Sequence, residues 1–114
     1  MPSAIRVLTL KDDAEVIRLD HLTSRRLVRQ IHGSSAMSFN VSTLEQGYDD
    51  RAVRYPDHDE IFYILAGEAE IEFDGVGRRL TPGMAVFIPR DSTYAYRVIK
   101  GPNELVAVFS PARS

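Results

Sequence analysis

The sequence contains no cysteine, no excess of basic charge and no long apolar run. Without cysteine, the chain can form neither disulfide bonds nor thiolate metal sites. The net charge is −2, from 14 basic and 16 acidic residues, so nothing points to nucleic acid as a partner. Arg25, Arg26 and Arg29 form a small basic cluster, which we interpret as a solvated strand face rather than a phosphate site.

The apolar segments are also short. None approaches the ~20 residues of a membrane-spanning helix, so we expect no membrane partner. The first residues, MPSAIRVLTLKDD, lack the apolar core and the small-residue cleavage site of a signal peptide. We therefore expect a cytoplasmic protein. The length of 114 residues predicts one domain with a buried core.

The most informative stretch covers residues 55–67 and reads YPDHDEIFYILAG. It joins an acidic segment containing His58 to the apolar segment Ile61–Leu65, which is followed by Gly67 after one alanine. The apolar segment is β-branched and aromatic, is too short for an independent helix and is bounded by turn residues. It therefore predicts a buried strand. The residues just before the strand would place polar groups at the mouth of the space that the strand helps to enclose.

Further strand-like segments follow one another with turn signals between them and almost no helix. We predict strands over residues 5–10, 26–31, 37–44, 53–55, 61–65, 68–73, 78–80, 85–88, 94–99 and 105–109. Residues 11–22 fit either an extended segment or a short helix capped by Asp12 or Asp13. Ala66-Gly67 and residues 100–103 are expected to be turns between separate strands. This pattern predicts an all-β sandwich or barrel.

Residues 37–44 alternate most clearly. Apolar residues dominate one face and polar residues the other: Met37, Phe39, Val41 and Thr43 against Ser38, Asn40 and Ser42. One of these faces must line the interior of the barrel, and the sequence leaves open which one.

Two longer motifs add a family resemblance. The segments DEIFYILAGEAEIEFDG and LTPGMAVFIPRDSTY resemble the two characteristic motifs of the cupin superfamily in wording and in spacing. The positions that carry the spacing are Gly47, Glu60, Gly67, Pro82, Gly83 and Pro89. The resemblance covers residues 37–109 and implies a double-stranded β-helix, a jelly-roll barrel with tight corners at glycines and prolines. On this basis residues 1–114 form a single cupin domain, with N-terminal strands over 1–36 and the barrel core over 37–110.

The resemblance also implies positions for a metal site. Cupins usually bind a divalent metal through two histidines and a glutamate of the first motif and a histidine of the second. Carried over residue by residue, the glutamate matches Glu60, the first two histidine positions fall on Val53 and Tyr55, and the third falls on Tyr94. Valine cannot ligate a metal and neutral tyrosine is a poor ligand. We therefore expect no standard metal site, no metal cofactor and none of the oxygenase activities of the family.

His58 and Glu60 are the first candidates for chemistry. They lie two residues apart, so in an extended segment both side chains could face the cavity. A histidine beside a carboxylate is the usual acid/base pair near neutral pH, because its unperturbed pKa is about 6.5. The alternative for His58 is an exposed loop position among acids. A carboxylate at the start of an apolar strand needs a partner, and Arg54, Arg90 or His58 could form a structural ion pair with Glu60.

Tyrosines are the second group of candidates. Tyr94 and Tyr96 share a face if their strand has no bulge, and with Tyr55 they could line the cavity. Such a lining suits a partly apolar ligand with a few fixed polar contacts, and a tyrosine can donate a proton where a nearby charge shifts its pKa. The alternative for each is a core aromatic with a satisfied hydroxyl. Asn40, on the polar face of its strand, is a further candidate ligand contact.

Some cupins that lack the histidine set are deoxysugar epimerases, ketoisomerases, dehydratases or cyclases, typically with a histidine base and a tyrosine. By this resemblance we predict a metal-independent acid/base enzyme of isomerase, dehydratase or cyclase type that binds a small molecule in the barrel. The catalytic candidates are His58, Glu60, Tyr94 and Tyr96. The candidate ligand-binding residues are Arg54, Tyr55, Arg90 and Asn40.

Two alternatives stay open. The chain could be a non-catalytic ligand-binding or sensor cupin, or a cupin with an unusual weak metal site at His58 and Glu60, with or without His32. We also expect a homodimer, partly by family resemblance, in which the N-terminal strands 5–10 and 26–31 pair across subunits and cover sheet edges. The sequence does not identify the substrate.

Overall fold

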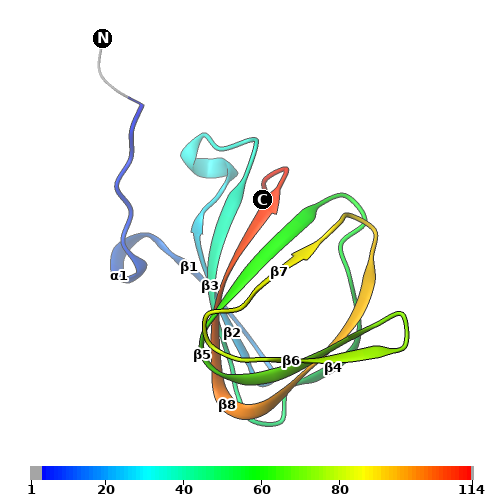
Figure 1. Ribbon diagram of the computed structural model, residues 1–114. Coiled ribbons are helices and arrows are strands. Elements are labelled where there is room, and N and C mark those ends of the chain that lie inside the picture. The colour runs from blue at the N-terminus through cyan, green and yellow to red at the C-terminus, as the bar shows by residue number, and fades with distance from the viewer. Residues whose placement is uncertain (1–3, 114) are drawn as a thin grey trace.

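The computed structural model describes residues 4–113, and nearly all of its elements are strands (Figure 1). In chain order the elements are α1 (Leu10–Asp13), β1 (Glu15–Leu19), β2 (Leu22–Val28), the short 3-10 helix η1 (Gln30–His32), β3 (Ser38–Leu44), β4 (Asp49–Arg54), β5 (Asp59–Phe73), β6 (Val76–Leu80), β7 (Ala85–Ile88) and β8 (Thr93–Ser110). The eight strands form one antiparallel sheet in the order β1-β2-β3-β8-β5-β6, with β4 on β8 and β7 on β5. The sheet closes on itself as a jelly-roll barrel, which confirms the predicted fold class.

Two long, bent strands hold the barrel together. The first half of β5 pairs with β7 and with the end of β8, and its second half pairs with β6 and the beginning of β8. The register shifts between Ile64 and Ala69, where β5 bends. The predicted turns at Ala66-Gly67 and at residues 100–103 are therefore wrong, because each strand continues through its bend.

The bend in β5 requires a glycine. Gly67 has a φ of +76°, and a Cβ at this position would lie 2.4 Å from the carbonyl oxygen of Pro102, so any side chain would collide with the backbone of β8. Asn103 is buried beside it and donates from Nδ2 to the carbonyl of Ala66 at 2.9 Å. The same side chain accepts the hydroxyl of Tyr96. These contacts fix the angle between the two halves of the barrel.

The N-terminal part differs from the prediction. Residues 5–10 do not form a strand; this segment runs away from the barrel and α1 begins at Leu10 (Figure 1). The helix is capped by Thr9, whose side chain accepts the Asp12 N–H at 3.2 Å, and not by Asp12 or Asp13. The predicted strand over residues 26–31 begins earlier and ends at Val28. Within residues 4–113, no helix is long and apolar enough to cross a bilayer.

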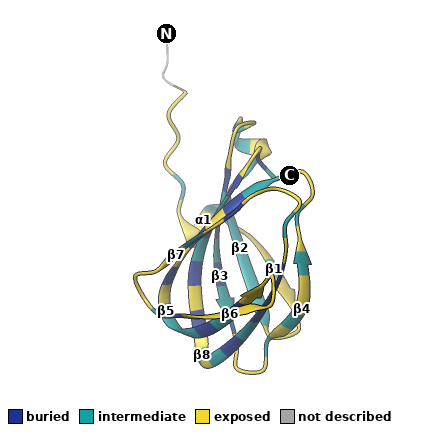
Figure 2. Cartoon of the chain, turned by 45° about the vertical axis from the view of Figure 1, so that its right-hand side comes forward, coloured by how far each residue is buried: buried dark blue, intermediate teal, exposed yellow. Residues whose placement is uncertain are grey.

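The interior of the barrel follows from strand alternation. Buried and more exposed positions alternate along β3 and along much of β5 and β8 (Figure 2). In β3 the polar face, with Ser38, Asn40 and Ser42, is the buried one. The predicted alternation is therefore correct, and the structure settles the open question of which face lines the interior.

Candidate functional site

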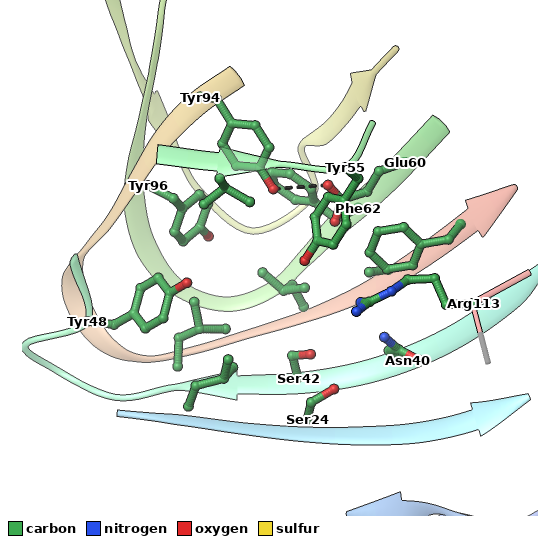
Figure 3. Close-up of a pocket in the computed structure, with 16 residues that line it drawn as sticks. Ser24, Asn40, Ser42, Tyr48, Tyr55, Glu60, Phe62, Tyr94, Tyr96 and Arg113 are labelled. Atoms are coloured by element: carbon green, nitrogen blue, oxygen red, sulfur yellow. Dashed lines mark hydrogen bonds between the residues drawn. The ribbon is translucent and has the colours of Figure 1, made fainter. Parts of the chain in front are cut away.

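A cavity with a volume of about 110 Å³ lies inside the barrel (Figure 3). Its walls come from β2, β3, β4, β5 and β8, and from the last residues of the described chain. A second hollow of about 400 Å³ lies between the ends of β5, β7 and the beginning of β8; it is mostly apolar, and Asp74 is the charged residue in its lining. Tyr94 lines both spaces. The polar groups that could perform chemistry are concentrated in the first cavity.

Glu60 and Tyr94 form the central pair of this cavity. Glu60 lies near the start of β5 and points inward between two more exposed neighbours, so that only 6% of it is exposed. The hydroxyl of the buried Tyr94 donates to its Oε1 at 2.9 Å (Figure 3). The partner of Glu60 is thus a tyrosine hydroxyl, not one of the predicted cations Arg54, Arg90 and His58.

Burial changes the acidity of both groups. Desolvation raises the pKa of Glu60 from 4.5 to about 7, against smaller opposing effects of the Tyr94 hydrogen bond and the charge of Arg113. Burial and the nearby Glu60 raise the pKa of Tyr94 well above its ordinary value. Near neutral pH Glu60 is therefore present in both protonation states, whereas Tyr94 stays neutral and acts as a hydrogen-bond donor.

Three further tyrosines line the cavity. Burial raises the pKa of Tyr48 to about 12 and also raises the pKa values of Tyr55 and Tyr96, so all three are neutral. The Tyr96 hydroxyl donates to Asn103 and is committed to the fold. Tyr48 was not among the predicted site residues, because it lies in the turn before β4, where no periodicity indicates a direction.

The opposite wall is polar. Asn40 and Ser42 project from β3 and Ser24 projects from β2, across the cavity from Glu60 and Tyr94 (Figure 3). Asn40 is only 4% exposed, and its Oδ1 has no hydrogen-bond partner within residues 4–113. Asn40, a candidate ligand contact from the sequence, thus lines the cavity, and the serines extend the same surface.

Arg113 is another cavity residue that was not among the predicted site residues. Its guanidinium carbon lies 4.8 Å from the ring centroid of Tyr55 and 4.9 Å from that of Phe109, within the range of cation–π attraction. These two rings pack edge to face with centroids 4.9 Å apart. A residue so far along the chain from Tyr55 reaches the cavity only through the tertiary fold.

His58 lies outside this cavity. Strand β5 begins at Asp59, so His58 belongs to the preceding turn and the expected i, i+2 alignment with Glu60 does not apply. Its Nδ1 lies 2.7 Å from the carbonyl oxygen of Pro111, and its ring lies edge-on to Phe109. The structure therefore places His58 against the C-terminal segment.

The two predicted arginines also lie outside the cavity. Nε of Arg54 donates to Asp91 Oδ1 at 2.7 Å, and Nε of Arg90 donates to Asp59 Oδ1 at 3.3 Å. Both arginine side chains are more than half exposed. Each arginine thus pairs with a nearby aspartate on the outside of the barrel.

The inherited metal positions do come together but do not fit a metal. Val53, Tyr55, Glu60 and Tyr94 all line the cavity. Glu60 alone among them offers a charged ligand, since both tyrosines are neutral and valine has no ligand atom. Among the described residues, no group of three or more histidines and acids is placed to hold a metal ion. His32, considered for an unusual site, instead accepts the Arg29 N–H at Nδ1 (3.1 Å).

Comparisons with known proteins agree with this architecture. The family described as Cupin domain matches residues 40–109. An uncharacterized protein of Aquifex aeolicus (strain VF5) is 33% identical over 58 residues, 51% of this chain and 48% of that protein, so the match spans about half of this relative's length. The ectoine synthase from P. lautus is 27% identical, with a TM-score of 0.86 over 96% of this chain and 80% of that one. The polyketide cyclase RemF from Streptomyces resistomycificus has the same fold, at 17% identity and a TM-score of 0.78, over 96% of this chain and 80% of that one.

Proposed function

Starting from the fact that the chain belongs to the cupin family, we propose that it is a small-molecule enzyme in which Glu60 transfers protons without a metal ion. One observation carries this proposal: a buried carboxyl group with a pKa of about 7 faces a cavity that can hold a small molecule. A group whose pKa lies near the working pH is the most effective acid and base. Strongly shifted pKa values are also concentrated at functional sites.

In this proposal Glu60 and Tyr94 have separate tasks. The Tyr94 hydroxyl engages Oε1 of Glu60, so Oε2 is the oxygen that exchanges a proton with the bound molecule. The ionised form of Glu60 takes a proton from a carbon next to a carbonyl group, or from a hydroxyl. The protonated form returns it to another atom. Isomerisation, dehydration and cyclisation all include such transfers. In a dehydration, for example, the proton leaves carbon, the C–O bond breaks, and the hydroxyl group departs as water with the proton that Glu60 returns. Tyr94 holds the carboxyl group in position for these transfers.

This assignment moves the proposed base from His58 to Glu60. His58 makes its hydrogen-bond contact with a backbone carbonyl outside the cavity, whereas Glu60 lines it. Tyr48 and Tyr55 contribute neutral hydroxyls and ring faces for an uncharged part of the ligand. The likeness to ectoine synthase, at 27% identity, supports an enzyme but does not specify the substrate.

Binding without chemical change is the second candidate. The buried Oδ1 of Asn40 without a partner favours a polar ligand in the cavity, and a receptor for such a ligand needs no proton transfer. The two candidates differ in one measurable property, the exchange of carbon-bound hydrogen with solvent.

The test is hydrogen exchange in D2O. The protein is incubated with a panel of small keto acids and hydroxy acids, and loss of the C–H signal next to the carbonyl group is followed by proton NMR. We expect exchange with the wild type and a fall of about 10²-fold or more in Glu60→Gln. Glu104→Gln, which removes an exposed carboxylate from β8, is the matched control and should exchange like the wild type. Unchanged exchange in Glu60→Gln would remove Glu60 from this role, and tight binding without exchange would favour the receptor.

We also propose a homodimer. Its interface would be the outer face of β5, and not the N-terminal strands over residues 5–10 and 26–31 that the sequence led us to expect. The outer face of β5 carries Ile61, Tyr63 and Leu65, each more than 40% exposed. Ile61 is in register with Phe87 of β7, which is 62% exposed, and with Val108 of β8. An apolar face of this kind is typical of an interface. A second copy of the chain placed on this face would remove it from water.

A further inference from the structure

The last described residues form a fixed wall of the cavity. Ala112 is buried, and four hydrogen bonds tie the segment Pro111–Arg113 to separate parts of the barrel. They join His58 Nδ1 to the Pro111 carbonyl (2.7 Å), Gln30 Nε2 to the Ala112 carbonyl (3.0 Å), the Ala112 N–H to the Ser35 carbonyl (3.1 Å) and the Arg113 N–H to Ser38 Oγ (3.0 Å). The backbone of Arg113 is therefore held in place, and its side chain is directed into the cavity (Figure 3).

The guanidinium group of Arg113 has no carboxylate partner. Seven other arginines form ion pairs with acidic residues, and none of these pairs lines the cavity through its arginine. Among the ion pairs of the described residues, none contains Arg113. Its neighbours are the faces of Tyr55 and Phe109. A cation that is partly removed from water is unfavourable unless it is paired. Glu60, the acidic residue of the cavity lining, is engaged by Tyr94, so the charge of Arg113 is available to a ligand.

The surroundings of Arg113 offer further hydrogen bonds. Asn40 lines the same cavity as Arg113, and its strand β3 also carries Ser38, which accepts the Arg113 N–H. Ser42 and Ser24 lie on the same side of the cavity as Asn40 (Figure 3). The amide of Asn40 and the two hydroxyls can donate to anionic oxygens, and the Asn40 Oδ1 still lacks a donor. A ligand that fills this end of the cavity should therefore carry both an anionic group and a hydroxyl or N–H group.

We infer that Arg113 and Asn40 form a subsite for the carboxylate of a small hydroxy acid or amino acid derivative. One guanidinium group matches one carboxylate in a bidentate pair, whereas a phosphate dianion would call for a second cation, and Arg113 is the cavity's cationic residue among those described. A cavity of roughly 150 Å³ holds a benzene-sized ring, so a space of about 110 Å³ encloses a short acid and leaves any longer part in the mouth. Bound in this way, the acid would extend from Arg113 toward Glu60.

This inference shares the cavity with the proposed function and rests on it in no other way. It can therefore be tested by ligand binding, without any catalytic turnover. The probes are lactate, 3-hydroxybutanoate and 4-hydroxybutanoate, each compared with its neutral amide. Binding is measured by calorimetry and by the NMR shift of the Arg113 Nε–H signal. We expect at least one acid to bind and move this signal, and its amide to bind about tenfold or more weakly, because the charge-assisted pair is lost.

Variants then separate the charge from the fold. Arg113→Gln keeps the backbone bonds of the tail but removes the cation, and should weaken binding of the acid about ten- to hundredfold without affecting the amide. Arg54→Gln is the matched control, since Arg54 pairs with Asp91 outside the cavity, and should bind the acid like the wild type. An equal affinity of Arg113→Gln and wild type for the acid, or no binding by any acid of the panel, would overturn the subsite.

Glu60→Gln distinguishes this inference from the proposed function. If Arg113 binds the carboxylate, Glu60→Gln still binds the acid, whether or not the wild type exchanges its carbon-bound hydrogen. If the wild type exchanges hydrogen but Arg113→Gln binds its substrate normally, the proton-transfer function survives and the subsite does not.

Discussion

Replacing Glu60 with glutamine should stabilise the protein at high pH and leave its stability almost unchanged at low pH. The reason is the cost of ionising a carboxyl group in the cavity. Glutamine has nearly the same shape, stays neutral and can still accept the Tyr94 hydroxyl through its amide oxygen. The comparison therefore isolates the charge of Glu60 from its packing and from its hydrogen bond.

The size of the effect follows from the two pKa values. The pKa of Glu60 is 4.5 ordinarily and about 7 in the folded protein. At about 1.4 kcal/mol for each pKa unit, the difference corresponds to roughly 3 kcal/mol. Because the pKa is raised in the folded state, the unfolded chain releases its proton first as the pH rises. Stability is then full below about pH 4.5, falls between 4.5 and 7, and reaches its lower level above pH 7.

Urea denaturation between pH 5 and pH 8 measures this dependence. The free energy of unfolding of Glu60→Gln minus that of wild type should rise by about 2–3 kcal/mol over this range. Glu104→Gln, with its exposed position in β8, should show no comparable rise. Tyr94→Phe should extend the fall in stability to higher pH, because it removes the hydrogen bond that lowers the folded-state pKa of Glu60, while the fall still begins near pH 4.5. A difference between Glu60→Gln and wild type that is the same at pH 5 and pH 8 would refute the raised pKa and, with it, acid/base chemistry by Glu60.

The remaining predictions concern the fold and its assembly. Gly67→Ala should lower the free energy of unfolding by about 3 kcal/mol or more, since it adds a backbone collision to the strain of a positive φ. Gly75 has a φ of +74° but open space around it, so Gly75→Ala should lower the free energy of unfolding by about 1 kcal/mol in the same denaturation assay. Asn103→Ala should cost about 2–4 kcal/mol, because it leaves two buried polar groups without their partner, and Tyr96→Phe should cost less because it removes one of these bonds. Phe87→Asp should convert the proposed dimer to a monomer in sedimentation velocity at micromolar concentration; a wild type that is already monomeric there would contradict the dimer.

Local sequence patterns predicted an all-β sandwich or barrel because β-strands repeat every two residues, and the cupin resemblance added the jelly-roll topology. The alternation of β3 was visible, as were the corner glycines and the motifs around Glu60. The same patterns could not reveal that β5 and β8 are continuous through their bends. A bent strand and two strands joined by a turn contain the same residue types, and only pairing with a partner strand distinguishes them. Gly67 was read as a turn residue for this reason.

The site was predicted in part, and the failures have a common physical cause. Glu60, Tyr94, Tyr55 and Asn40 lie on or beside strands, where alternation restricts each side chain to one of two faces, and the structure brings all four together at the cavity. His58 lies one residue before a strand begins, where that rule no longer holds. The position of Arg113 depends on contacts with residues far away in the sequence, such as Ser38 and Tyr55. The same is true of the arginines that pair with aspartates on the surface. A local hydrophobic pattern carries no information on such contacts.

The chemistry proposed for Glu60 follows from the uncharged side chains that surround its carboxyl group. A divalent cation beside this carboxyl would hold its pKa low and keep it ionised. In this chain Val53, Tyr55 and Tyr94 occupy the other positions of the inherited ligand set, and none of them carries a positive charge. Desolvation then becomes the largest effect on the carboxyl, and it raises the pKa toward neutrality. In the proposed function, a carboxyl group that is buried beside these uncharged side chains gains and loses its proton near neutral pH. The same reasoning predicts the behaviour of a variant with Val53→His and Tyr55→His, which introduces two imidazoles beside Glu60. Addition of a divalent metal to this variant should lower the pKa of the Glu60 carboxyl group, and a carbon-13 NMR titration would measure that change.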